Sequence, residues 1–234
     1  MKRFERKSQV KNLLKKYGHI WVCGYILLYL PYFFWLESVI TDNYKIMHVA
    51  LDDMIPFSEY FIIPYIIWFF YVSGAVLYFF FTDKQDYYRL CAFLFIGMTI
   101  SMMICTFYPN GTDLRVEVDP NKNVFCYLVQ KIQDSDTPAN VFPSIHVYNS
   151  LGVHISVMNS GRLKNRRWVR RISFVIMVAI CLSTVFLKQH STLDVASGIL
   201  LASLLYPVFY VHNCIPYRKE FPLALNNSGD AIKK

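Results

Sequence analysis

The chain contains five apolar stretches long enough to cross a lipid bilayer and a sixth close to the minimum length. A transmembrane helix needs roughly 17–25 mostly apolar residues. The sequence therefore predicts an all-α, polytopic membrane protein with six transmembrane helices. The predicted spans cover residues 18–40, 60–81, 89–107, 144–159 (the short one), 169–187 and 193–211.

The composition agrees with a membrane protein. Hydrophobic residues make up 55% of the chain and charged residues only 17%, too apolar for an ordinary soluble domain. The formal charge of +8 suits either nucleic acid or an anionic membrane surface. Because the apolar runs are so long, we expect a membrane and no nucleic-acid partner.

The distribution of basic residues predicts the orientation. We divide the chain into a basic cytoplasmic arm (1–17), a six-span membrane domain (18–213) and a cytoplasmic tail (214–234). With six spans, 19 of the 24 lysines and arginines fall on the side of the two termini. Loops rich in these residues stay in the cytoplasm. Both termini should therefore be cytoplasmic.

Two stretches, 141–146 and 188–194, lie at the starts of apolar segments on the opposite, non-cytoplasmic side. Pro143 and Ser144 are helix-start signals, and Ser191 with Asp194 resembles a capping pair. A helix start attracts anions through its unpaired N–H groups and dipole. Two such starts on one rim indicate a site for an anionic, phosphorylated substrate.

His146, His190 and Asp194 are the candidate catalytic residues. A single interfacial histidine is more often structural, but ionisable groups at membrane depth are costly and often functional. Asp194 either complements the helix dipole or accepts from one ring nitrogen of His190, four residues earlier. In the second case the other nitrogen is left as a nucleophile or base.

Three more residues are candidates for binding phosphate. Lys188 is either an interface anchor or a point charge on phosphate oxygens. Arg115 lies in a loop, and its planar guanidinium suits phosphate. Ser144 caps its helix, contacts phosphate, or does both.

At these positions the chain resembles the type 2 phosphatidic acid phosphatase superfamily, over roughly residues 60–212. Pro143-Ser144-Ile145-His146 is similar to the family's Pro-Ser-Gly-His. Ser183, His190 and Asp194 match its Ser-Arg, five residues, His, three residues, Asp. The resemblance implies a helical bundle with its site at the membrane rim. It also implies that His190 forms a phosphohistidine, oriented by Asp194, while His146 acts as acid and base.

The chain departs from the family pattern at its cations. Thr184 stands where the family has arginine, Tyr108 where it has lysine, and Val116 follows Arg115 in place of proline. We expect Lys188, four residues after Thr184 on the same helix face, to supply the missing charge. With the bulky Ile145 in place of glycine, the segment from Phe142 to His146 resembles the branch of the family that includes transferases similar to inositol phosphorylceramide synthase.

These observations predict a lipid phosphatase of the plasma membrane, acting on a phosphatidic acid or prenyl pyrophosphate type of lipid without metal or cofactor. One alternative is a phosphotransferase that moves a phospho-headgroup to an alcohol such as a ceramide or diacylglycerol. A second is a metal enzyme that uses His146, His190 and Asp194 as ligands. A third is a transporter or scaffold with a degenerate site. The sequence leaves the oligomeric state open.

Overall fold

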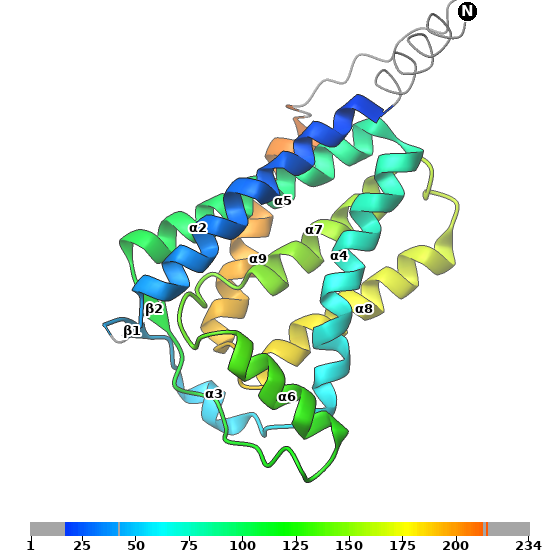
Figure 1. The fold of residues 1–234 in the computed structure, drawn as a ribbon. Helices are drawn as coiled ribbons and strands as arrows, with labels where there is room; N and C mark the ends of the chain where they lie inside the picture. The colour runs from blue at the N-terminus through cyan, green and yellow to red at the C-terminus, as the bar shows by residue number, and fades with distance from the viewer. Residues whose placement is uncertain (1–16, 42, 213, 215–234) are drawn as a thin grey trace, which may run out of the picture.

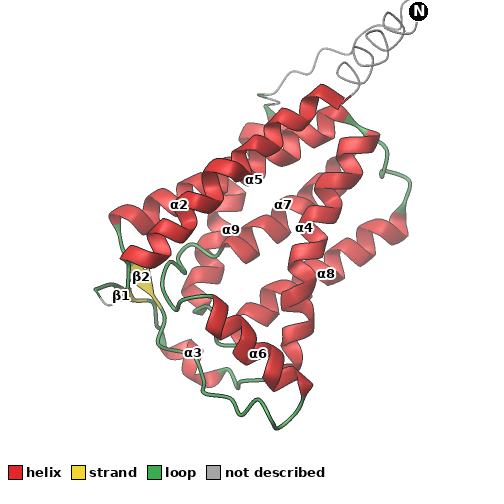
Figure 2. Cartoon of the chain, in the orientation of Figure 1, coloured by secondary structure: helices red, strands yellow, loops and turns green. Residues whose placement is uncertain are grey.

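The computed structural model describes residues 17–41, 43–212 and 214. The described chain is mostly helical (Figure 2). A 3₁₀ segment, η1 (Gly18–Gly24), leads into α2 (Tyr25–Val39), and a π-helical turn, η3 (Pro207–Val211), extends the last helix. The other long helices are α4 (Ile62–Thr82), α5 (Lys84–Phe107), α7 (Ile145–Asn159), α8 (Arg167–Phe186) and α9 (Thr192–Tyr206).

Within the described residues, five helical segments are long and apolar enough to cross a membrane, in agreement with five of the six predicted spans. They are Gly18–Val39, Glu59–Thr82, Lys84–Phe107, Arg167–Phe186 and Thr192–Val211. The remaining predicted span forms α7, which has 15 residues. At 1.5 Å per residue α7 is about 22 Å long, shorter than the ~30 Å hydrocarbon layer. By length, α7 is therefore shorter than a typical membrane-spanning helix.

Helix α7 is instead the central helix of the bundle, packed against α4, α5, α8 and α9 (Figure 1). Close approach depends on glycine at two contacts. A Cβ on Gly97 of α5 would lie 2.0 Å from the Tyr148 ring of α7. A Cβ on Gly198 of α9 would lie 2.9 Å from the Ser144 carbonyl oxygen. Gly198 therefore lets α9 press against the start of α7.

One end of the bundle, here called the terminal end, holds both Gly18 and Val211. At this end His19 Nε2 lies 3.0 Å from the Phe80 carbonyl oxygen of α4. Ser156, near the end of α7, shares a hydrogen bond of 2.5 Å with Tyr210. The first and last membrane-length segments therefore begin and end, respectively, on the same side of the bundle.

The opposite end, here called the histidine end, is covered by short elements. β1 (Lys45–Ile46) pairs in parallel with β2 (Asn110–Gly111). Between the first two long helical segments lie a short helix, α3 (Ala50–Met54), and a 3₁₀ turn, η2 (Glu59–Phe61). The polar segment between α5 and α7 contains α6 (Val124–Ser135), which lies beside the start of α4 (Figure 1).

Candidate active site

The turn between α8 and α9 places His190. Thr184, near the end of α8, accepts hydrogen bonds at its carbonyl oxygen from the backbone N–H of Gln189 (3.0 Å) and of His190 (3.1 Å). Lys188 immediately precedes these two residues. Its φ of 57° is in the left-handed conformation that usually favours glycine. This pattern is a Schellman ending, with lysine in the glycine position. The turn reverses the chain and directs His190 back toward the bundle.

The start of α9 has the capping arrangement predicted from the sequence. Ser191 accepts from the Leu193 N–H at 3.1 Å, and Asp194 Oδ2 accepts from the Ser191 N–H at 3.0 Å. The same Asp194 Oδ2 lies 3.3 Å from His190 Nδ1. The Asp194 residue is fully buried, at 0% exposure. Asp194 therefore both caps α9 and fixes the imidazole of His190.

The start of α7 is joined directly to the start of α9. Ser144 is the N-cap of α7 and accepts from the Val147 N–H at 3.5 Å. The Ser144 N–H donates to the Asp194 carbonyl oxygen at 3.2 Å. Ser144 is fully buried, at 0% exposure. The predicted capping role of Ser144 is confirmed, and the backbone contact brings the two helix starts together.

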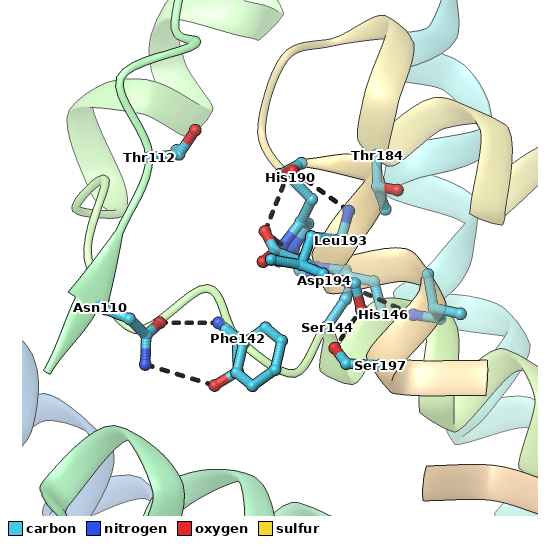
Figure 3. A network of polar contacts seen from close by, with 12 residues as sticks. Asn110, Thr112, Phe142, Ser144, His146, Thr184, His190, Leu193, Asp194 and Ser197 are labelled. Carbon is cyan, nitrogen blue, oxygen red and sulfur yellow. Dashed lines mark hydrogen bonds and ion pairs between the residues drawn. The ribbon is translucent and has the colours of Figure 1, made fainter. Parts of the chain in front are cut away.

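His146 and His190 meet at this junction (Figure 3). His146 Nδ1 lies 3.2 Å from His190 Nε2, although the two residues are 44 positions apart. An ionised carboxylate only accepts, so with Asp194 ionised the proton of this contact is on His190 Nδ1. His190 Nε2 then carries a lone pair and accepts from His146 Nδ1. Asp194, His190 and His146 thus form one directed chain of hydrogen bonds.

Two aromatic side chains of α4 hold the His146 ring. Its centroid lies 4.7 Å from that of Tyr65 and 4.3 Å from that of Trp68. The Trp68 Nε1 atom is buried and has no hydrogen-bond partner within the described residues. Sequence reasoning missed both residues, because an aromatic side chain in an apolar span carries no separate signal.

Asp52 of α3 is a second residue that sequence reasoning missed. Its carboxylate accepts from Ser191 Oγ at 2.6 Å and from the Thr192 N–H at 2.7 Å. Burial raises the pKa of Asp52, but these hydrogen bonds outweigh it and hold the pKa below its ordinary value. Asp52 therefore ties the loop between the first two long helical segments to the residues that follow His190.

The two candidate cations are engaged with other groups of the protein, mainly backbone carbonyl oxygens, and Arg115 Nη2 also lies 3.5 Å from Asp136 Oδ2. Lys188 Nζ donates to the Asp52 carbonyl oxygen, and Lys188 is buried. Arg115 donates to the carbonyl oxygens of Asp136 (2.6 Å) and Thr137 (2.8 Å). Neither cation is hydrogen-bonded to His146, His190 or Asp194 in the described part of the chain. The Arg115 Nε atom is buried without a partner among these residues.

The loop that precedes α7 is held by Glu37 and Asn110, which sequence reasoning also missed. Glu37, near the end of α2, accepts from Asn140 Nδ2 at 2.6 Å and from both the N–H and the hydroxyl of Thr137. Asn110 Oδ1 accepts from the Phe142 N–H at 2.8 Å (Figure 3). These bonds join the first long helical segment to the segment that carries His146.

The geometry also bears on the metal alternative. A metal site needs three donor atoms that point at one position. Here the nitrogens of the two histidines face each other, and the remaining His190 nitrogen faces Asp194. No group of three or more histidine, cysteine or acidic residues is arranged to hold a metal ion within residues 17–41, 43–212 and 214.

No protein-family model, curated protein or solved structure matches the chain. The geometry of the site itself therefore indicates its chemistry. That geometry offers a nucleophilic nitrogen on His190, a second imidazole for proton transfer on His146, and a carboxylate that orients the first.

Proposed function

We propose that the chain is a membrane phosphatase that hydrolyses a phosphorylated lipid through a phosphohistidine at His190. One observation carries the proposal, namely the hydrogen-bonded chain from Asp194 through His190 to His146. An oriented base next to a nucleophile is the arrangement used in nucleophilic catalysis. The resemblance to the type 2 phosphatidic acid phosphatase superfamily assigns the same three residues the same roles.

In the first step His190 Nε2 attacks the phosphorus of the lipid phosphate. A nitrogen–phosphorus bond forms and the bond from phosphorus to the lipid oxygen breaks. The departing oxygen takes its proton from His146, which is doubly protonated at the start of this step and neutral at its end. Because Nε2 and the His146 nitrogen are only 3.2 Å apart, their hydrogen bond must open to admit the phosphoryl group.

In the second step His146 takes a proton from water, and the resulting hydroxide attacks the phosphohistidine. The nitrogen–phosphorus bond breaks, which releases inorganic phosphate and restores His190. Proton transfer by one positioned histidine contributes about 10²–10⁴-fold to the rate. Phosphoryl transfer otherwise depends mainly on positioning and on stabilisation of charge.

Lys188, Arg115 and the N–H groups at the start of α7 are our proposed phosphate-binding groups. Lys188 precedes His190 by two residues, and its ammonium is held by one backbone carbonyl oxygen. Arg115 keeps a buried Nε that has no partner in the described residues. Ser144 would contribute mainly through its cap, which sets the direction of the α7 N–H groups.

A lipid substrate follows from the position of the site. His146 and His190 lie at one end of the bundle. The membrane-length helices beside them have apolar surfaces that suit acyl or prenyl chains. With both termini in the cytoplasm, as the distribution of basic residues predicts, the site faces the non-cytoplasmic side. Here α7 would be the sixth span, short and enclosed by the other helices.

Two alternatives are kept as outcomes of the test. An alcohol such as ceramide or diacylglycerol could replace water in the second step, which would make the protein a phosphotransferase. The second alternative is a transporter or scaffold that binds lipid but does not turn it over. The hydrogen bonds of Lys188 and Arg115 to backbone carbonyl oxygens favour it, because they leave the site without free cations for phosphate.

The test is to incubate the purified protein with a panel of lipid phosphates and phosphodiesters, with and without an alcohol acceptor. We expect release of free phosphate that resists a chelator and is blocked by vanadate. A lipid with an exchanged headgroup would show the transferase instead. Lipid movement that persists in His190→Ala, without either product, would contradict an enzymatic function.

A further inference from the structure

A second candidate site lies at the terminal end of the bundle, away from His146 and His190. A cavity of about 620 Å³ opens there between α7 and α8. Arg167, Arg170 and Arg171 line it at the start of α8. Its other walls include three apolar side chains, Met158, Phe174 and Val175. The cavity thus combines a basic rim with an apolar wall.

The three arginines of this cavity have no acidic partner in the part of the chain that the structure describes. None of them forms an ion pair with a carboxylate within the described residues. Arg170 donates from Nε to Met158 Sδ at 3.1 Å and from Nη1 to the Lys164 carbonyl oxygen at 3.4 Å. By contrast, Arg162, in the basic segment between α7 and α8, lies 3.8 Å from an Asp83 carboxylate oxygen. The positive charge at the cavity is therefore uncompensated by the described protein.

The position of these arginines on the helix adds to the imbalance. The first turn of a helix carries partial positive charge and favours acidic side chains. The first turn of α8 has none, and its N-cap residue Arg166 makes no side-chain capping bond. Repulsion among these groups falls when an anion binds beside them. The apolar wall runs on along α8, since Phe174 and Val175 lie one to two turns beyond Arg170.

We propose that this cavity binds the headgroup of one anionic glycerophospholipid from the adjoining leaflet. Arg170 and Arg171 contact its phosphate, and an acyl chain lies along Phe174 and Val175. The amphipathic lining favours a lipid over free inorganic phosphate, which has no use for the apolar wall. This inference goes beyond the proposed enzymatic function and does not depend on it.

The test uses the full chain in nanodiscs of phosphatidylcholine that contain phosphatidylglycerol, with retained lipid counted by native mass spectrometry. Arg170→Gln/Arg171→Gln should lower the affinity for phosphatidylglycerol by about 25-fold, since each basic residue near an anionic surface contributes roughly fivefold. Arg162→Gln/Lys164→Gln is the matched control, because it removes the same charge from the same link without altering a cavity-lining side chain. It should retain the lipid.

A further variant guards against misfolding. Arg170→Lys/Arg171→Lys keeps the charge and should retain most of the bound lipid. Loss of the lipid from Arg170→Gln/Arg171→Gln alone supports the site. Equal retention by the glutamine and control variants would overturn the proposal, as would equal retention of phosphatidylcholine. Displacement of the lipid by millimolar inorganic phosphate would also overturn it, because the site would then be one for free phosphate.

Discussion

His146 Nδ1 lies 3.2 Å from His190 Nε2, so two helix starts 44 residues apart place their imidazoles in direct contact. The contact depends on the backbone bond from the Ser144 N–H to the Asp194 carbonyl oxygen. It also depends on Gly198, where any side chain would press against Ser144. The pair is therefore a product of helix packing, and substitutions at either ring test its function directly.

Substitution of the two histidines should have unequal effects. His190→Ala removes the nucleophile and should lower turnover at least about 10⁴-fold, while His146→Ala removes proton transfer and should lower it about 10²–10⁴-fold. Hydrolysis of a lipid phosphate by purified protein measures both. His212→Ala, an exposed histidine at the terminal end, is the control and should leave the rate unchanged. Wild-type rates in His190→Ala would end the proposal.

Asp194→Asn should separate the shape of the site from its charge. Asparagine can still accept from the Ser191 N–H and so preserve the cap of α9. It cannot supply the charge that holds the proton on His190 Nδ1. We expect kcat to fall about 10²–10⁴-fold with little change in thermal stability. An unchanged kcat would show that the 3.3 Å contact to His190 has no catalytic role.

Lys188 combines a strained backbone with a buried ammonium, and two substitutions separate these features. Lys188→Gly and Lys188→Met both remove the charge, but only glycine suits the φ of 57°. The glycine variant should be about 1–2 kcal/mol more stable than the methionine variant in thermal unfolding. Both should show a similarly reduced kcat. Full activity in both would remove Lys188 from the phosphate-binding groups.

Asp52 should make the stability of the protein depend on acid. Its pKa in the folded protein lies below its ordinary value, because its hydrogen bonds to Ser191 and Thr192 outweigh burial. Its contribution is therefore complete above the unfolded pKa of about 3.9 and is lost as the pH falls through the folded pKa. Asp52→Asn should be less stable than the wild type at pH 7, and this difference should shrink toward pH 3. A constant difference in the unfolding midpoint would contradict this.

Much of the helical framework was predictable from the apolar runs alone, because the length of a membrane span limits where helices begin and end. The capping pair of Ser191 and Asp194 followed from local residue types, and so did the cap at Ser144. Helix α7 was less well predicted. Its 15 residues include several small polar ones, and their burial against other helices is a property of the bundle and not of the segment.

The supporting residues of the site could not be found in the sequence. Asp52 and Glu37 act through bonds to segments about 100 or more positions away, as in the contacts of Asp52 with Ser191 and of Glu37 with Thr137. Only folding brings such partners together. Lys188 illustrates the same limit. Its spacing from Thr184 suggested a phosphate ligand, while its contact with the Asp52 carbonyl oxygen depends on a loop that the local sequence does not place.

The central claim is that His190 Nε2 carries the phosphoryl group during the reaction. The direct measurement is to mix purified protein with ³²P-labelled lipid phosphate, quench it in alkali within milliseconds to seconds, and map the labelled peptide by mass spectrometry. We predict an acid-labile, alkali-stable label on His190, present in His146→Ala and absent in His190→Ala. Turnover without any label on His190, or a label on another residue, would contradict the account.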